Sequence, residues 1–285
     1  MQDVTILILT KNEELNIAKC LESVKGFAKR CVIVDSGSTD RTKEIAIEYG
    51  ADFYENPFVN YATQFNWGLD NTNITTKWVI RLDADERFTP ELCKELDKQM
   101  VLHDNDNVNG FVLEARLFFM DKELKHGGSR KKKLMVFKNG LGRIENRKMD
   151  EHTVLSEGVA IEIKEPFLHY DFKDLTSYVK KLNWYATREM QDYIDGAFPK
   201  DGFEASNKEI EDVRSKKTKY YKAPIFWRCI LYFLYAYFIL GNCRNGKEGF
   251  IYSFLYHLYY RMLVDFKIYE QLKYHREFEV TGDLK

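Results

Sequence analysis

The first 85 residues alternate between two hydrophobic patterns, and this alternation most constrains the fold. Continuous apolar runs of four to six residues, typical of buried strands, are separated by segments whose apolar residues recur three and four apart, as in helices. A repeated strand–helix order implies an α/β protein with a mainly parallel sheet and helices on both faces. The expected strands are residues 4–9, 31–34, 51–54 and 78–82, and the expected helices are 12–24, 39–49 and 61–70.

Polar clusters follow three of the four expected strands. They are Thr10 to Glu13, Asp35 to Asp40, and Asp83 to Asp85. Each cluster alone is typical of a helix cap or a turn. Ligands of parallel α/β sheets collect at the carboxyl ends of the strands, so three clusters at one edge favour a binding site.

The third cluster has the spacing of a cation site. On an extended chain Asp83 and Asp85, at positions i and i+2, point the same way. Paired carboxylates hold Mg²⁺ or Mn²⁺ and leave coordination positions open for phosphates. An isolated Asp-x-Asp is also common in solvated turns, so the pair gains its meaning from the clusters around it.

Beyond residue 110 the pattern becomes richer in strands, and then helical. Strands are expected at 111–117, 133–137 and 159–163, a helix from 174 or 176 to 194, and a linker or exposed helix at 195–219. The basic run from Arg130 to Lys133 can bind an anion or form a solvated loop.

Composition excludes several classes of protein. The 285 residues carry 43 Lys and Arg against 44 Asp and Glu, which gives no argument for a nucleic-acid binder. Five cysteines without a C-x-x-C spacing indicate reduced thiols and no zinc site. The start of the chain lacks a basic segment before its apolar run, so we expect no signal peptide and a cytoplasmic protein.

Four motifs together resemble family 2 glycosyltransferases of the GT-A fold, and within them the bacterial branch that builds lipopolysaccharide cores and capsules. The motifs occur in the family's order over about the first 175 residues: Ile8 to Glu13, Val34 to Asp40, Leu82 to Glu86 and Met149 to His152. The resemblance implies a catalytic domain over 1–195, with a nucleotide-binding half (1–100) and an acceptor half (101–195). Residues 196–285 would form a helical region.

The resemblance also implies an inverting transfer from a nucleotide-sugar, with UDP the usual nucleotide, assisted by Mg²⁺ or Mn²⁺. Asp85 would be the direct metal ligand, with Asp83 shared between ribose and metal. His169 is the candidate third ligand, although a single histidine at a strand end is often structural. The nucleotide-binding candidates are Thr10, Asn12, Glu13, Asp35, Gln64 and Asp83.

An inverting reaction needs a base for the acceptor hydroxyl. By resemblance Glu151 is that base and Asp150 the alternative, in a group that can equally form an acidic helix N-terminus. Two other classes remain open: a sugar-phosphate nucleotidyltransferase, which usually carries a glycine-rich loop after its first strand, and a non-catalytic nucleotide-sugar-binding protein.

The C-terminal third is rich in aromatic residues. The apolar stretch 229–240 would be about 18 Å long as a helix, short of the roughly 30 Å of a bilayer core. Its tyrosines and the lysines upstream favour peripheral contact through 220–270 with the inner face of the membrane, where a lipid-linked or lipopolysaccharide glycan would be the acceptor. The alternative is that 224–240 and 250–266 pack on the catalytic domain or in a homo-oligomer.

Overall fold

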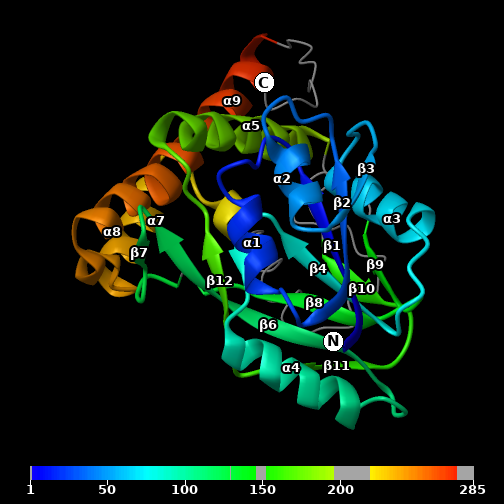
Figure 1. Ribbon diagram of the computed structural model, residues 1–285. Helices are drawn as coiled ribbons and strands as arrows, with labels where there is room; N and C mark the ends of the chain where they lie inside the picture. Colours follow the sequence, from blue (N-terminus) through cyan, green and yellow to red (C-terminus); the bar gives the residue numbers. More distant parts are fainter. Residues whose placement is uncertain (1, 129, 146–151, 196–218, 275–285) are drawn as a thin grey trace. The chain divides into compact units, whose positions relative to one another are not determined.

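The computed structural model describes residues 2–128, 130–145, 152–195 and 219–274 (Figure 1). The chain divides into two compact units. The sheet unit comprises residues 1–118 and 130–171, and the helical unit comprises 119–129 and 172–285. The functional division expected after residue 195 stays a prediction.

A mixed sheet forms the centre of the sheet unit. Along the order β3-β2-β1-β4-β8-β6-β12-β5, all neighbouring pairs are parallel except those made by β8 and β5. β11 also pairs with β6, and β10 and β9 form a separate ribbon. The bounds are β1 (Gln2–Thr10), β2 (Ala28–Asp35), β3 (Asp52–Glu55), β4 (Trp78–Asp83), β5 (Glu86–Arg87), β6 (Val108–Phe119), β8 (Lys132–Lys138), β9 (Gly142–Ile144), β10 (Thr153–Leu155), β11 (Val159–Glu162) and β12 (Phe167–Tyr170).

Helices cover both faces of this sheet (Figure 1). The even-numbered apolar residues of β1 pack in one core cluster with α1 (Ile17–Ser23), α2 (Thr42–Glu48) and α4 (Pro90–Leu102). Leu7 faces the other way and packs with α3 (Tyr61–Asn71). This alternation along a strand produces two hydrophobic layers from one sequence run.

Strand register brings the expected polar clusters to one edge. Thr10 pairs with Asp35 across β1 and β2, and Leu9 pairs with Asp83 across β1 and β4. The carboxyl ends of these strands therefore lie side by side, as the strand–helix order predicts.

The helical unit is built around α5 (Leu175–Ile194), which packs against α9 (Tyr260–Tyr274). Asp174 caps α5 by accepting the Ser177 N–H. The other described elements are β7 (Lys122–Glu123), α7 (Trp227–Leu234), the π-helix η1 (Tyr235–Ile239), the 3₁₀ helix η2 (Asn242–Asn245), α8 (Gly246–Tyr252) and the π-helix η3 (Ser253–Tyr259). No helix among the described residues is long and apolar enough to cross a membrane.

The structure confirms the expected fold class, a mainly parallel α/β sheet flanked by helices, with a helical C-terminal region. Two expectations differ in detail. The first helix begins at Ile17 rather than at residue 12, because Asn12 has a φ of 55° and cannot start a helix. α4 is not among the expected helices, although its Thr89 cap and Pro90 at the first turn are ordinary helix-start signals.

Candidate active site

Asp35 organises the end of β2. Its Oδ1 accepts the N–H groups of Gly37 and Ser38 at 2.8 and 2.6 Å, and its Oδ2 accepts the hydroxyls of Thr10 and Ser38 at 2.7 and 2.5 Å. The side chain is buried, and four donors fill the positions that a carboxylate offers. Asp35 therefore shapes the loop after β2. Its expected contact with the nucleotide base stays a prediction, and it would require the base to replace one of these four donors.

The other nucleotide candidates connect the loops at the same edge. Asn12 Oδ1 accepts the Thr39 N–H at 2.8 Å, and the Glu13 N–H donates to Thr42 Oγ1 at 2.8 Å. Both bonds join the loop after β1 to the segment that leads into α2.

Gln64 is fully buried and joins a third loop to the same edge. Its Nε2 donates to Ser36 Oγ at 3.2 Å and to the Asn56 carbonyl at 3.0 Å, while its Oε1 accepts the Asn56 amide at 2.8 Å. Apart from Asp83, the predicted nucleotide residues thus lie in loops that hydrogen bonds join to one another, and direct contact of each with a nucleotide remains a prediction.

Asp83 and Asp85 make different contacts. Asp83 is the last residue of β4, and its two oxygens accept the Tyr61 hydroxyl and, at 3.1 Å, Lys133 Nζ. Asp85 lies in the turn between β4 and β5, where its Oδ2 is 3.4 Å from His169 Nε2. The strand ends at Asp83, so Asp85 lies outside it. The expected same-side orientation of the two carboxylates, which assumed an extended strand, therefore does not apply.

Asp85, His169 and Asp171 form a group that can hold a metal ion. One ligand atom from each lies within 4.8 Å of the others, and all three side chains are partly exposed. Two carboxylates and an imidazole fit Mn²⁺ and also accept Mg²⁺. The expected ligands Asp85 and His169 are thus together, Asp83 is not in this group, and Asp171 had not been predicted.

Burial and neighbouring charges shift the pKa values of several side chains of the site. Burial alone would lower the pKa of the His169 imidazole, but the Asp85 carboxylate beside it outweighs burial and raises that pKa. Burial would raise the pKa of the Asp83 carboxyl, but Lys133 and Arg81, together with the hydrogen bond from Tyr61, outweigh burial and lower that pKa. Burial raises the pKa of Glu86. The edge therefore brings the carboxyl groups of Asp83 and Glu86 against Lys133, and that of Asp85 against His169.

The base candidates Glu151 and Asp150 lie outside the described residues. Thr153, which follows them at the start of β10, accepts Arg81 Nη1 at 3.3 Å through its Oγ1. Arg81 in turn donates through Nε to the Tyr61 hydroxyl at 3.0 Å. Thr153, which follows the base candidates in the chain, is thus linked to Asp83 through Arg81 and Tyr61.

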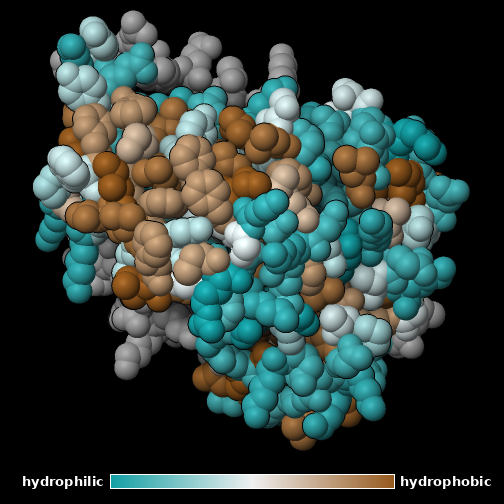
Figure 2. All heavy atoms as spheres, turned by 90° about the vertical axis from the view of Figure 1, so that its left-hand side faces the viewer, coloured by the Kyte–Doolittle hydropathy of each residue, from teal (hydrophilic) through white to brown (hydrophobic). Residues whose placement is uncertain are grey.

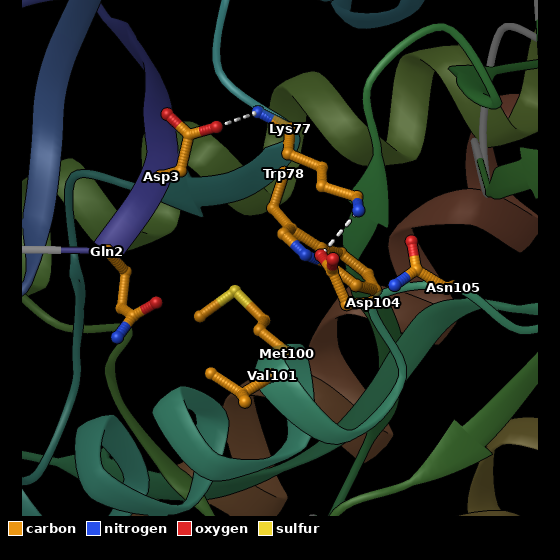
Figure 3. Close-up of a pocket in the computed structure, with 8 residues that line it drawn as sticks. All are labelled: Gln2, Asp3, Lys77, Trp78, Met100, Val101, Asp104 and Asn105. Carbon is orange, nitrogen blue, oxygen red and sulfur yellow. Dashed lines mark hydrogen bonds and ion pairs between the residues drawn. The ribbon is translucent and has the colours of Figure 1, made fainter.

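A pocket of about 370 Å³ lies elsewhere in the sheet unit (Figure 3). Gln2 and Trp78 are the first residues of β1 and β4, so the pocket lies at the amino ends of the strands. Lys77 crosses it, with its N–H on Asp3 and its Nζ on Asp104 at 2.5 Å (Figure 3). The pocket is therefore separate from the polar edge at the carboxyl ends.

The fold and the site define an α/β protein with a polar edge at the carboxyl ends of its parallel strands and a potential Asp-His-Asp metal group. The profile of glycosyl transferase family 2 matches residues 5–153, and the chain belongs to this family. The chain is therefore a glycosyltransferase, which decides against the nucleotidyltransferase class.

Curated relatives of this chain are glycosyltransferases too. An uncharacterized glycosyltransferase of Rickettsia felis is 25% identical over 90% of this chain and 86% of its own length. The lipopolysaccharide core biosynthesis glycosyltransferase LpsC of Rhizobium meliloti is 26% identical over 94% of this chain and 92% of its own. Glucosyl-3-phosphoglycerate synthase from Mycobacterium tuberculosis, solved with Mn²⁺ and UDP, is 20% identical over 40% of this chain and 44% of its own, with a TM-score of 0.31.

Proposed function

We propose that this glycosyltransferase moves a hexose or N-acetylhexosamine, with inversion, from a UDP-sugar to a glycan acceptor. The observation that carries the proposal is the Asp85–His169–Asp171 group at the same sheet edge as the loops expected to bind the nucleotide. A Mg²⁺ or Mn²⁺ ion held there would act as a Lewis acid on the diphosphate and improve it as a leaving group.

The protein's own residues perform the rest of the reaction. The loops after β1 and β2 hold the nucleoside, and Glu151, or Asp150 in its place, takes the proton of the acceptor hydroxyl. The hydroxyl oxygen forms a bond to the anomeric carbon while the bond from that carbon to the diphosphate oxygen breaks. Attack from the face opposite the diphosphate inverts the anomeric centre.

A donor screen tests this proposal. Hydrolysis of UDP-glucose, UDP-galactose, UDP-N-acetylglucosamine and UDP-N-acetylgalactosamine is measured with Mn²⁺, with Mg²⁺ and with a chelator. We expect metal-dependent turnover of one donor, its loss in Asp85→Asn, and normal turnover in Asp3→Asn, a matched change at the opposite edge of the sheet. Glu151→Gln should bind that donor normally but not hydrolyse it. Turnover that a chelator leaves unchanged would contradict the metal assignment.

We further propose that the acceptor is membrane-associated, as in the lipopolysaccharide core synthesis named for LpsC. The α7–η1 segment exposes Trp227, Leu231, Phe238 and Ile239, whose spacing places them on one helical face. Ile239 is 74% exposed. Figure 2 shows apolar side chains gathered over the side where α7 and α8 lie. An exposed apolar area of this kind is typical of an interaction surface.

Several charged side chains of α5, α7 and α9 form ion pairs in the interior of the helical unit. Asp265 and Arg228 form an ion pair that is almost completely buried. Glu189 is buried too, and its Oε1 accepts Arg261 Nη1 at 3.1 Å and the Tyr221 hydroxyl at 2.6 Å. Soluble domains usually show the reverse arrangement. Buried charges under an apolar exterior suit helices that lie in the headgroup region.

The surrounding charge favours an anionic lipid surface as the partner. Apart from Arg228, Arg261 and Asp265, which form ion pairs inside the unit, residues 219–274 contain six lysines and arginines against two acidic residues. Each basic residue close to an anionic bilayer contributes about 1 kcal/mol of attraction. Together with the apolar face, this surplus supports peripheral binding at the inner face of the membrane.

Sedimentation with vesicles of phosphatidylglycerol and phosphatidylethanolamine tests the membrane proposal. A quadruple variant in which Trp227, Leu231, Phe238 and Ile239 are all replaced by Ser should bind the vesicles at least about tenfold more weakly than wild type. The reason is that each of these side chains would bury apolar area in the membrane interface. Val101→Ser with Leu102→Ser, two exposed apolar residues of the sheet unit, should bind as wild type does. A stable dimer that does not sediment would contradict the proposal and favour the homo-oligomer.

A further inference from the structure

The four basic residues of the run 130–133 differ in what they contact. Arg130 lies at the surface and pairs with Glu114 at 2.9 Å, and Lys132 pairs with Glu162. Lys133 instead reaches the carboxylates after β4. Strand alternation explains the difference, since successive residues of β8 point to opposite faces.

Lys133 is anchored on one side and open on another. Its Nζ donates to Glu86, whose side chain is 1% exposed, and to Asp83 Oδ2 at 3.1 Å. An ammonium group has three N–H donors. Among the described residues, no protein oxygen takes the third. The ammonium also lies 5.7 Å from the centre of the Phe167 ring, and the side chains of Lys133 and Asp83 are each 25% exposed, so both are partly accessible to solvent.

The same turn carries the metal group. Asp85 lies between Asp83 and Glu86, and Glu86 pairs with His169 in the register of β5 and β12. A metal ion on Asp85 and His169 would therefore share its surroundings with the Lys133 ammonium.

A nucleoside diphosphate carries more negative charge than one divalent ion balances. Developing charge on a leaving group is stabilised most by fixed donors that are already in place. Glu86 fixes Lys133 from the buried side, and Asp83 is held on its other oxygen by Tyr61. The ammonium is therefore preorganised and still has donor capacity.

We propose that Lys133 positions the donor by giving its third N–H to a phosphate oxygen of the nucleotide diphosphate, while Glu86 keeps hold of the same ammonium group. The inference rests on the proposed function and adds a residue to it. No covalent step is involved, and the lysine stays charged throughout.

The test separates this role from a merely structural ion pair. Lys133→Met alone would leave Glu86 buried without its cation and can fail to fold. The informative variant is therefore Lys133→Met combined with Glu86→Gln, compared with Glu86→Gln alone and with Lys133→Arg. Thermal melting establishes that each variant is folded. Calorimetry then measures the dissociation constants of UDP, GDP, CDP and ADP and of their nucleosides, with and without Mn²⁺.

We expect the double variant to bind the preferred diphosphate about tenfold or more weakly than Glu86→Gln does, the effect of one charge-assisted hydrogen bond. Binding of the matching nucleoside should not change, and Lys133→Arg should stay within a few-fold of wild type. Equal diphosphate affinity in the double variant and in Glu86→Gln would overturn the inference and leave the proposed function intact. A wild-type protein that binds none of the four diphosphates would overturn both.

Discussion

The buried ion pair of the helical unit allows a quantitative prediction. The Asp265 carboxylate is fully buried on α9 and accepts the Phe226 N–H at 2.9 Å, Arg228 Nε at 3.0 Å and the Cys229 thiol at 3.1 Å. Arg228 Nη2 donates to it as well. One side chain of α9 thus fixes the start of α7, including the backbone turn that leads into it.

Asp265→Asn keeps the shape of this side chain and removes its charge. Arg228, which is 4% exposed, would then be a buried cation without a counter-charge. Removing one partner of a buried ion pair costs about 3–5 kcal/mol. For a unit of this size that lowers the melting temperature by roughly 10 °C or more.

The double variant Arg228→Met with Asp265→Asn separates charge from packing. It removes both charges, keeps similar volumes, and leaves the asparagine oxygen to accept the Phe226 N–H. Replacing both partners of a buried pair is often neutral, so we expect most of the lost stability to return. The assay is thermal unfolding of the full chain by circular dichroism at 222 nm. A double variant as unstable as Asp265→Asn would refute the electrostatic argument.

Two further predictions concern the sheet unit. Gly68→Ala would place a Cβ 3.0 Å from Val34 Cγ2 and 3.1 Å from the Leu7 methyl groups. We expect this crowding to lower the free energy of unfolding, measured in urea, by about 1–3 kcal/mol. An unchanged urea midpoint would contradict this tight packing of α3. Asp171→Asn should weaken Mn²⁺ binding, followed by electron paramagnetic resonance, by about a hundredfold or more, since even supporting groups cost 10–100-fold. Asp83→Asn should weaken Mn²⁺ binding less than Asp171→Asn does. Equal losses of Mn²⁺ affinity in the two variants would contradict the assignment of Asp171 as a ligand.

Much of the sheet unit can be predicted from sequence because burial leaves a regular pattern. β1 and β4 are buried on both faces over most of their length and are therefore mainly apolar, while α3 shows helical spacing and a clear Asn60 cap. The carboxyl edge follows from this order, since parallel strands end together. Local sequence thus predicts which loops meet.

The partners within that edge are less predictable, because they come from distant segments. Asp171 reaches Asp85 only because β12 pairs with β5, an antiparallel contact that no local pattern announces. One signal was present: His169 and Asp171 share the i, i+2 spacing of Asp83 and Asp85. The contact of Lys133 with Asp83 depends likewise on the position of β8 in the sheet, and a charge run alone does not reveal it.

The pairing of β5 with β12 has a consequence for the rate of amide hydrogen exchange beside the metal group. The Tyr170 N–H donates to the Asp85 carbonyl at 2.8 Å, so the turn and the strand already touch through one backbone bond. An ion held by Asp85 and His169 would fasten two segments that are far apart along the chain, and separating them would first require the ion to leave. Amide hydrogen exchange at Tyr170 would then slow with Mn²⁺ concentration, which makes this single N–H a reporter of the loaded state before any sugar is bound.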